Sequence, residues 1–452
     1  MPEFFGTDGI RGRANQYPMT AEIALKAGRA LVWALKNRGG RKRILIGKDT
    51  RISGDMIECA IAAGICSAGG SAHLCGVLPT PGVAHLTVSE SMDAGVVISA
   101  SHNPYADNGI KFFDANGFKL SMEMEIAIDQ MIQELDTAPD KYASDVVLGT
   151  VCANPTLERS YRDFLLQTMP SKDFLKGVRV VLDCSNGAAY RVAPDVFEAM
   201  GADVITIGAS PDGQNINQGC GSQDTGRLKQ EILENGADIG LAFDGDGDRL
   251  IAVDETGRNV TGDPILAICA KYLKDAGKLS NNVVVSTVMS NVGLHRAMED
   301  LGINLVITDV GDRYVLEQMR AHGAVIGGED SGHMIFLDTH TSGDGILTGL
   351  RLIQIMQETA QPLSALSDII QIYPQVLMNV EVKERVDIYQ FPEIKEVISR
   401  VENALDHKGR VLVRYSGTQP LCRVMVEGPD PEQTHQYCLE IIGAIQERIG
   451  KK

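Results

Sequence analysis

Several features that would place a protein in a common class are missing from these 452 residues. No apolar run approaches the roughly 20 residues that a membrane-spanning helix needs. The nine cysteines contain no C-x-x-C pair, so the sequence indicates neither a zinc site nor a disulfide framework. The G-x-x-x-x-G-K-[ST] pattern of many ATP-hydrolysing enzymes is also absent. We therefore expect no membrane partner, and thiols that are reduced and buried.

Positive charge is also scarce. Lysine and arginine total 42 against 59 aspartates and glutamates, and the net charge of −17 opposes binding to nucleic acid or anionic membranes. Residues 1–5 lack the basic region and long apolar stretch of a secretory signal. We expect a cytoplasmic protein without a nucleic-acid partner. An anionic substrate would have to be bound by cations placed locally.

The chain does contain an alternation of short apolar runs with longer helical patterns. This alternation is typical of βαβ units, and the length implies roughly three or four domains, so we expect an α/β fold. From about residue 373 apolar and polar residues alternate, which favours an antiparallel sheet in a smaller α+β domain. The expected strands are 43–47, 94–98, 110–113, 178–183, 239–243, 282–286, 324–328, 376–382, 411–414 and 422–426. The expected helices are 56–68, 193–200, 264–273 and 431–449.

Three of the expected strands are each followed by a polar loop rich in glycine or serine. These loops are residues 99–104, 244–249 and 329–333. In open parallel sheets, ligands bind beyond the carboxyl ends of the strands. We therefore expect three similar domains that face one cleft.

The first of these loops reads Ser-Ala-Ser-His-Asn-Pro over residues 99–104. A hydroxyl at the end of a buried strand can act as a nucleophile. An ordinary turn is the alternative, because serine, asparagine and proline dominate turns. The presence of the other loops in the same chain favours the nucleophile. Lys111, ten residues after Ser101, could reach back toward it.

The second loop holds Asp244, Asp246 and Asp248, whose spacing by two lets the carboxylates project to one side of an extended segment. Such hard oxygen donors suit Mg²⁺. A solvated acidic turn is the alternative. The same spacing occurs in calcium-binding EF-hand loops, but Arg249 stands where that loop needs glycine, and strands rather than helices are expected on both sides.

A further loop reads Arg-Tyr-Ser-Gly-Thr over residues 414–418 and is followed by Arg423. Arginine suits phosphate because its planar fork pairs with two oxygens. A polar turn is the alternative to a phosphate site. The candidate phosphate-binding residues are Arg414, Ser416, Gly417, Thr418 and Arg423.

The remaining candidates lie in the third loop and near the start of the chain. Glu329, Asp330 and Ser331 offer groups that bind sugar hydroxyls. His333 and His102 are candidates for proton transfer, although a lone histidine is more often structural. Arg11 lies among glycines, where a surface turn is the alternative to a functional arginine.

Taken together, five motifs resemble, in order, the signatures of the α-D-phosphohexomutases. They are residues 5–12 (FGTDGIRG), 99–104 (SASHNP), 244–249 (DGDGDR), 328–333 (GEDSGH) and 414–418 (RYSGT). Residues 5–12 and 107–113 look most like the bacterial phosphoglucosamine mutases, which interconvert glucosamine 6-phosphate and glucosamine 1-phosphate on the route to UDP-N-acetylglucosamine and cell-wall precursors. The resemblance covers essentially the whole chain.

The resemblance implies three related α/β domains with mixed, mainly parallel sheets plus a smaller C-terminal α+β domain around a central cleft. We expect these domains at residues 1–154, 155–255, 256–368 and 369–452. It also implies a small-molecule sugar phosphate as substrate, a sugar bisphosphate as intermediate and activator, and a homodimer.

The resemblance also implies roles for the candidate residues. Ser101 would be carried as a phosphoserine, and Mg²⁺ would be held by Asp244, Asp246, Asp248 and an oxygen of the Ser101 phosphate. Arg11, Lys111 and Arg249 would place charge near the reacting groups, and Lys111 ranks ahead of His333 as acceptor of the hydroxyl proton. Glu329 and Ser331 would contact sugar hydroxyls, the loop at 414–423 would hold the phosphate that is not reacting, and Arg313 would help to shape the cleft.

Two positions depart from the pattern of the family. Asp330 stands where the phosphoglucosamine mutases usually have glutamine, and we hypothesise that it attracts the 2-ammonium group of an amino sugar. Gln419 stands where the family commonly has glutamate. The alternative functions are a phosphomannomutase or phosphoglucomutase, a metal-dependent phosphatase, and a non-catalytic sugar-phosphate sensor.

Overall fold

The computed structural model describes residues 3–6, 8–35, 42–137, 148–154, 156–406, 408–415 and 421–451. The chain forms two compact units. The first unit comprises Met1–Val288 and Val306–Ser367, and the second comprises Met289–Leu305 and Asp368–Lys452. None of the helices in the described ranges combines the length and the apolarity needed to cross a membrane.

The first sheet of the larger unit has seven strands, with parallel pairs at one side and antiparallel pairs at the other. In spatial order they are β1 (Phe5–Gly6), β2 (Gly9–Arg13), β6 (Asp107–Asp114), β5 (Ala94–Ile98), β3 (Arg43–Lys48), β4 (Ser71–Val77) and β7 (Val151–Ala153). The associated helices are α1 (Ala21–Ala34), α2 (Gly54–Ser67), α3 (Thr80–Ser89) and α4 (Met122–Thr137). The expected strands at 43–47, 94–98 and 110–113 correspond to β3, β5 and β6.

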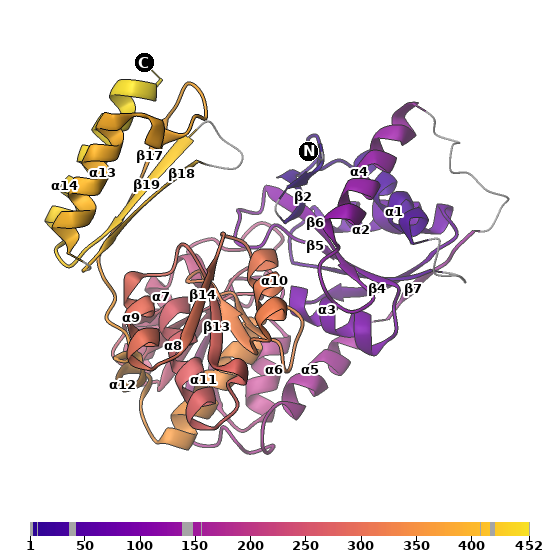
Figure 1. Cartoon of the computed structure of the whole chain (residues 1–452). Coiled ribbons are helices and arrows are strands. Elements are labelled where there is room, and N and C mark those ends of the chain that lie inside the picture. The colour runs from indigo at the N-terminus through magenta and orange to yellow at the C-terminus, as the bar shows by residue number, and fades with distance from the viewer. Residues whose placement is uncertain are drawn as a thin grey trace. The chain divides into compact units, whose positions relative to one another are not determined.

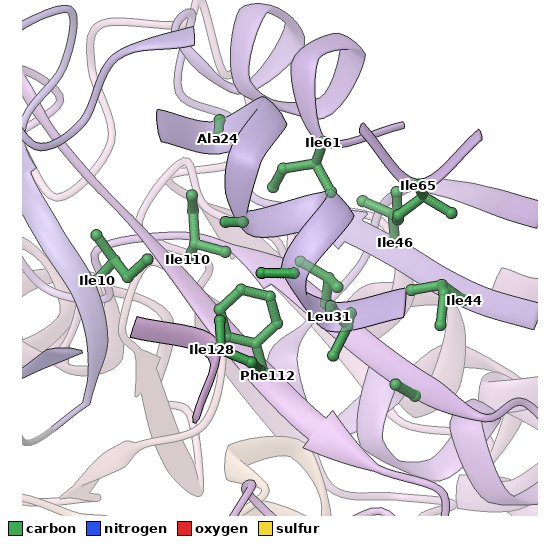
Figure 2. Packing of buried hydrophobic residues seen from close by; sticks show 14 of the residues in the cluster. Ile10, Ala24, Leu31, Ile44, Ile46, Ile61, Ile65, Ile110, Phe112 and Ile128 are labelled. Carbon is green, nitrogen blue, oxygen red and sulfur yellow. The ribbon is translucent and has the colours of Figure 1, made fainter. Parts of the chain in front are cut away.

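Helices α1, α2 and α4 pack with this sheet around one apolar core (Figure 2). Ile44 and Ile46 of β3 and Ile110 of β6 are fully buried in it. Helices α1 and α2 approach each other closely at Gly28, where a Cβ atom would lie 2.4 Å from the Ile61 carbonyl oxygen. Strands β3, β5 and β6 are buried along nearly their whole length, and alternate residues such as Ile44 and Ile46 face this core.

The second sheet has five strands. In spatial order they are β12 (Asn259–Val260), β11 (Leu250–Asp254), β10 (Ile239–Phe243), β8 (Arg179–Asp183) and β9 (Asp203–Ile207). The stretch of chain that forms this sheet also contains helices α5 (Leu157–Gln167), α6 (Val192–Ala199) and α7 (Gly226–Asn235). Strands β10 and β8 pair in parallel, whereas β10 and β11 pair antiparallel across the acidic loop.

The third sheet has four strands, in the order β14 (Asn304–Thr308), β13 (Val283–Thr287), β15 (Ile326–Gly328) and β16 (Met334–Phe336). Its chain region contributes helices α8 (Gly262–Asp275), α10 (Asp312–His322), α11 (Gly345–Thr359) and α12 (Leu363–Ser367). Helix α11 contacts β10 and β11 of the second sheet as well as α8. The expected helix at 264–273 is α8, longer by two residues at each end.

The three sheets repeat one strand order. Reading from the antiparallel return strand, the first contains β6-β5-β3-β4, the second β11-β10-β8-β9 and the third β16-β15-β13-β14. The three polar loops at 99–104, 244–249 and 329–333 each join the same two positions of this pattern. The expected class of three related α/β domains with mixed sheets is thereby confirmed, and equivalent loops of the three domains carry the candidate residues.

The second unit is an α+β structure, as expected. Its sheet has the antiparallel order β17 (Gln375–Glu381), β19 (Leu421–Glu427) and β18 (Arg410–Tyr415). Helices α13 (Pro392–Leu405) and α14 (Pro431–Ile449) cover one face of the sheet (Figure 1). Helix α9 (Val292–Asp300) also belongs to this unit, although the helices that follow it in the chain, α10 to α12, belong to the larger unit.

Hydrogen bonds connect the segment around α9 to the C-terminal stretch of the second unit. The wholly buried Glu427 carboxylate accepts hydrogen bonds from the Val292 backbone N–H at 3.0 Å and from Arg410 Nε at 2.7 Å. Asn291 donates to the Tyr373 carbonyl and accepts from the Tyr373 backbone N–H. The unit is therefore built from two separate stretches of the chain.

Candidate active site

Ser101 lies directly after β5 and is buried, with 1% of its surface exposed. Its backbone has φ = 52°, a left-handed conformation that non-glycine residues rarely adopt. The Ser101 N–H donates to the Ser99 hydroxyl, and the Ser101 hydroxyl donates to Asp244 Oδ2. The structure therefore brings the first and second loops together at the serine. A strained backbone that the surroundings hold in place is a common feature of functional sites.

Arg51 anchors the loop that carries Ser101. Its side chain is completely buried and pairs with Asp49 at 2.8 Å. Arg51 Nη2 donates at 2.8 Å to the carbonyl oxygens of Ser101 and Asn103, and Nη1 donates to those of Pro104 and Asp107. One guanidinium thus fixes four carbonyl groups of one loop.

The sequence analysis did not identify Arg51, nor Asn217, whose Nδ2 donates at 2.9 Å to the Ser101 carbonyl oxygen. A signal for Arg51 was present. Residues 49–51, Asp-Thr-Arg, follow strand β3 in the same arrangement of a strand and then a polar loop as the three loops that were selected. Asn217 stands 116 positions from its partner, and no local pattern marks it.

Asp244, Asp246 and Asp248 lie buried in the turn between β10 and β11, with one ligand atom from each within 4.8 Å of the others. Strands therefore flank the acidic loop, as expected, so the EF-hand alternative fails. Burial raises the pKa of Asp244 well above its ordinary value, and Asp248 and Asp246 raise it further. Among the described residues, Asp246 Oδ1 and Asp248 Oδ1 are buried oxygens without a hydrogen-bond partner. Unpartnered carboxylate oxygens that converge in this way fit a hard divalent cation.

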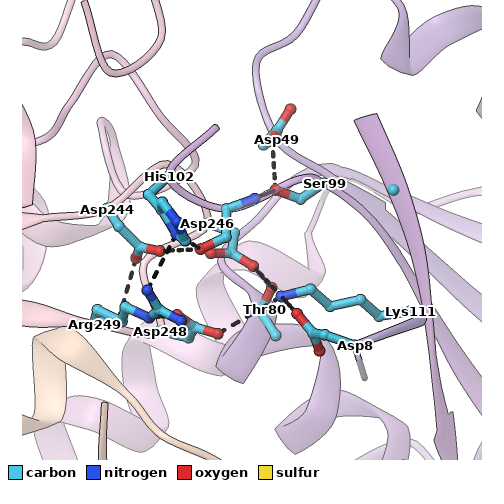
Figure 3. A network of polar contacts seen from close by, with 12 residues as sticks. Asp8, Asp49, Thr80, Ser99, His102, Lys111, Asp244, Asp246, Asp248 and Arg249 are labelled. Carbon is cyan, nitrogen blue, oxygen red and sulfur yellow. Dashed lines mark hydrogen bonds and ion pairs between the residues drawn. The ribbon is translucent and has the colours of Figure 1, made fainter. Parts of the chain in front are cut away.

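Lys111 is the main cation beside this triad (Figure 3). Its Nζ lies 2.8 Å from Asp246 Oδ2, 3.3 Å from Asp8 Oδ2 and 3.7 Å from Asp248 Oδ2. Burial alone would lower the pKa of Lys111, but the carboxylates of Asp246, Asp8 and Asp248 outweigh burial and raise it above its ordinary value. The three carboxylates therefore favour the protonated form of Lys111.

Asp8 connects the N-terminal motif to this cluster. It forms ion pairs with Arg11, Lys111 and Lys119. Burial raises the pKa of Asp8, but these three cations hold it well below its ordinary value. Arg11 lies in strand β2 rather than in a surface turn and belongs to this partly buried charge network. Its Nε atom is buried and has no hydrogen-bond partner among the described residues.

Arg249 and His102 lie on the side of Asp246 opposite to Lys111 (Figure 3). Arg249 Nη1 donates to His102 Nδ1 at 3.1 Å, and the same nitrogen of His102 lies 3.3 Å from the Ser101 hydroxyl oxygen. Burial, followed by the charges of Arg249 and Arg11, lowers the pKa of His102 to about 4. His102 is therefore neutral at neutral pH and accepts a hydrogen bond from the guanidinium.

His333 is buried directly before β16, between two carboxylates. Its Nδ1 lies 3.6 Å from Asp248 Oδ2, and its Nε2 lies 3.8 Å from Asp312 Oδ2. Burial would lower the pKa of His333, but Asp248 and Asp312 raise it above its ordinary value. The third loop therefore meets the second loop at this histidine.

The sugar-loop candidates have different exposures. Glu329 is buried and its Oε1 accepts a hydrogen bond from the Gly311 N–H at 3.0 Å, whereas Ser331 is exposed. Asp330 Oδ1 accepts from the Asp263 N–H at 3.1 Å, at the start of α8. One oxygen of Asp330 thus caps a helix, a structural role that the sequence analysis did not include.

Arg313 braces two parts of the larger unit. Its Nη2 donates to Glu125 Oε1 of α4 at 2.6 Å and to the Leu120 carbonyl oxygen at 3.2 Å. These contacts tie the first turn of α10 to the first domain. Arg313 therefore shapes this region through protein contacts.

The phosphate-loop candidates belong to the second unit. Ser416, Gly417 and Thr418 lie outside the described residues. Arg414 of β18 and Arg423 of β19 are direct cross-strand partners, so their side chains share one face of the sheet. Like charges in this arrangement repel, and Arg423 Nε is buried without a partner among the described residues. Two neighbouring guanidinium groups of this kind are suited to bind an anion such as phosphate.

Comparisons with known proteins cover the whole chain. Four family models of phosphoglucomutase/phosphomannomutase match it: alpha/beta/alpha domain I over residues 2–139, domain II over 159–257, domain III over 261–373 and the C-terminal domain over 377–444. A phosphoglucosamine mutase of Syntrophus aciditrophicus is 55% identical over 100% of both chains. Another from Syntrophobacter fumaroxidans is 53% identical over 100% of both chains.

Solved structures show the same fold. A phosphoglucomutase/phosphomannomutase family protein of Burkholderia thailandensis matches with a TM-score of 0.81 at 22% identity, over 99% of each chain. An N-acetylphosphoglucosamine mutase of Aspergillus fumigatus, solved with GlcNAc-6P and magnesium, matches with a TM-score of 0.69 at 18% identity, over 98% of this chain and 95% of that one. Four matched domains in order, and relatives more than 50% identical over their full length, show that the chain belongs to the phosphoglucomutase/phosphomannomutase family, the α-D-phosphohexomutases.

Proposed function

We propose that this protein interconverts glucosamine 6-phosphate and glucosamine 1-phosphate through a phosphoserine at position 101 and a sugar bisphosphate. The observation that carries the proposal is the contact between the Ser101 hydroxyl and Asp244, which joins the nucleophile loop to the acidic triad. The high identity to relatives named phosphoglucosamine mutase supports the choice of substrate.

In the proposed reaction, the phosphoryl group leaves the Ser101 oxygen and bonds to the free hydroxyl oxygen of the sugar monophosphate, which gives up its proton. The resulting bisphosphate turns round. Its other sugar O–P bond then breaks as that phosphoryl group bonds to the Ser101 oxygen, and the sugar oxygen takes back the proton to form a hydroxyl. The left-handed backbone at Ser101, held by Arg51 and Asn217, fixes the serine oxygen before the sugar arrives.

Asp244, Asp246 and Asp248 would hold Mg²⁺ together with an oxygen of the Ser101 phosphate. When bound, the ion neutralises charge on the transferring phosphoryl group. The fit rests on Asp246 Oδ1 and Asp248 Oδ1, two buried oxygens that have no hydrogen-bond partner among the described residues. Lys111 and Arg249 would add fixed positive charge on either side of the triad.

Lys111 and His333 are the two groups proposed to accept the hydroxyl proton, with Lys111 ranked first from the sequence. Three carboxylates surround the Lys111 ammonium group, and Asp248 and Asp312 lie on either side of the His333 ring. Lys111 would also stabilise negative charge near the reacting groups.

Arg414 and Arg423, together with Ser416, Gly417 and Thr418, would bind the phosphate that is not reacting. Glu329 and Ser331 would contact the sugar hydroxyls in both orientations. We keep the proposed division along the chain into four domains at residues 1–154, 155–255, 256–368 and 369–452, with the stretch Met289–Leu305 of the third assigned to the second compact unit. A homodimer and a cytoplasmic location also belong to the proposal.

A phosphorus NMR time course tests this function. The protein is incubated with Mg²⁺, a trace of sugar bisphosphate, and separately with the 6-phosphates of glucosamine, glucose and mannose. We expect the 1-phosphate to appear fastest from glucosamine 6-phosphate. Preference for glucose or mannose would indicate a sister mutase, release of free phosphate alone a phosphatase, and no change a sugar-phosphate sensor.

Asp330 offers a separate test of amino-sugar preference. Asn can keep the cap on the Asp263 N–H and removes only the charge, so Asp330→Asn isolates the proposed attraction to the 2-ammonium group. We expect the kcat/KM ratio of glucosamine to glucose 6-phosphate to fall about two- to fivefold, the effect of one partly exposed ion pair. An unchanged ratio in coupled assays would leave Asp330 with the helix cap alone.

A further inference from the structure

Thr80 makes two hydrogen bonds to one residue of the acidic triad. It is the first residue of α3 and is buried, with 1% of its surface exposed. Its hydroxyl donates to Asp246 Oδ2 at 2.7 Å, and its backbone N–H donates to the Asp246 carbonyl oxygen at 2.8 Å. Thr80 belongs to the first sheet's region and Asp246 to the second, 166 positions away.

These bonds decide how the Asp246 carboxylate is turned. Oδ2 receives two donors, the Thr80 hydroxyl and Lys111 Nζ at 2.8 Å (Figure 3). Oδ1 is left buried and without a partner among the described residues. The two oxygens of Asp246 therefore have different surroundings, and only Oδ1 is available to an ion.

The first turn of α3 is itself fixed on both sides. A Cβ on Gly247 would lie 3.2 Å from the Pro79 ring, so the acidic loop packs closely on the residue before Thr80. His340 Nε2 lies 3.0 Å from the Pro81 carbonyl oxygen, and His340 Nδ1 accepts from the Ser342 N–H, which makes Nε2 the protonated donor to Pro81. Thr80 is thus held at a junction of all three α/β domains.

We propose that Thr80 is a positioning residue of the metal site: its hydroxyl turns Asp246 so that Oδ1 faces the ion. The proposal rests on the metal-dependent function proposed above. Groups that orient metal ligands affect metal affinity strongly, and their loss weakens binding by roughly ten- to a hundredfold. Without the hydroxyl, Asp246 can rotate and share both oxygens with Lys111.

The test compares Thr80→Val with Thr87→Val in the full-length protein. Thr87 lies in the same helix and is fully buried, and its hydroxyl donates to the Val83 carbonyl oxygen at 2.7 Å. The control therefore removes a buried hydroxyl whose hydrogen bond is made within the helix and not to the acidic loop. Free Mn²⁺ is followed by electron paramagnetic resonance as the metal is titrated. We expect Mn²⁺ to bind at least about tenfold more weakly to Thr80→Val, with wild-type affinity in Thr87→Val and in Thr80→Ser, which restores the hydroxyl.

Each other outcome has one meaning. Equal Mn²⁺ affinity in wild type and Thr80→Val overturns the positioning role and leaves the proposed function standing. Absence of Mn²⁺ binding by the wild type overturns the metal site and the positioning role with it. If circular dichroism shows Thr80→Val to be unfolded, Thr80→Ala decides, because it removes the hydroxyl without adding a methyl group at the same place; wild-type affinity in that variant also overturns the role.

Discussion

The Ser101→Ala variant is expected to lose mutase turnover by at least about 10⁴-fold, the scale of loss when a covalent nucleophile is removed. The serine oxygen forms and breaks a bond to phosphorus in both halves of the proposed reaction. Alanine has no atom that can replace it. Coupled assays measure the loss, and intact-mass measurement after incubation with sugar bisphosphate is expected to find the phosphoryl group on the wild type and none on the variant.

Ser185→Ala is the matched control for this experiment. Ser185 is also a buried serine after a β-strand, and its φ is 52° as well, but its hydroxyl donates to the Cys184 carbonyl oxygen. We expect Ser185→Ala to be phosphorylated and active. Measurable mutase activity in Ser101→Ala, at a level above that of a mock purification, would remove Ser101 as the phosphoryl carrier.

Replacing Arg51 with methionine is expected to lower the free energy of unfolding by about 3–5 kcal/mol, the cost of breaking a buried ion pair by removing one partner. Asp49 would lose its buried cation, and four carbonyl groups of the loop would lose their donor. Urea unfolding followed by circular dichroism measures the effect on the larger unit. Turnover is expected to fall in parallel because the same loop carries Ser101.

Two further variants separate charge from geometry at Arg51. Arg51→Lys keeps a positive charge for Asp49 but loses the fork that reaches four carbonyl groups, so an intermediate loss is expected. Adding Asp49→Asn to Arg51→Met removes the unpaired charge and is expected to recover part of the stability. A urea midpoint in Arg51→Met equal to that of the wild type would contradict the anchoring role.

The sequence was a good guide where the information is local. The apolar run 239–243 coincides with β10, and the helical pattern at 431–449 coincides with α14. A buried strand is apolar along its length, whereas a helix with one buried face repeats apolar residues every three or four positions. The three polar loops could be placed because each follows such a strand. Strands as short as β1 and β7 left too few residues for any period to show.

Contacts between residues that are far apart in the chain could not be predicted from the sequence. Nothing around Thr80 indicates that its hydroxyl meets Asp246. Lys111 was expected to reach toward Ser101, and the sequence did not indicate that its ammonium group pairs with Asp246 and Asp8, whose charges favour its protonated form. Such properties depend on which chain segments the fold brings together, and local sequence does not contain them.

A gene fragment that starts at residue 369 would encode an incomplete C-terminal unit. The stretch Met289–Leu305 would be missing, and with it the Val292 N–H that binds the buried Glu427 and the Asn291 side chain that bonds twice to Tyr373. A separately expressed version of this unit would therefore need the earlier stretch grafted back through a linker. Cloning boundaries drawn from chain order alone would cut through its packing.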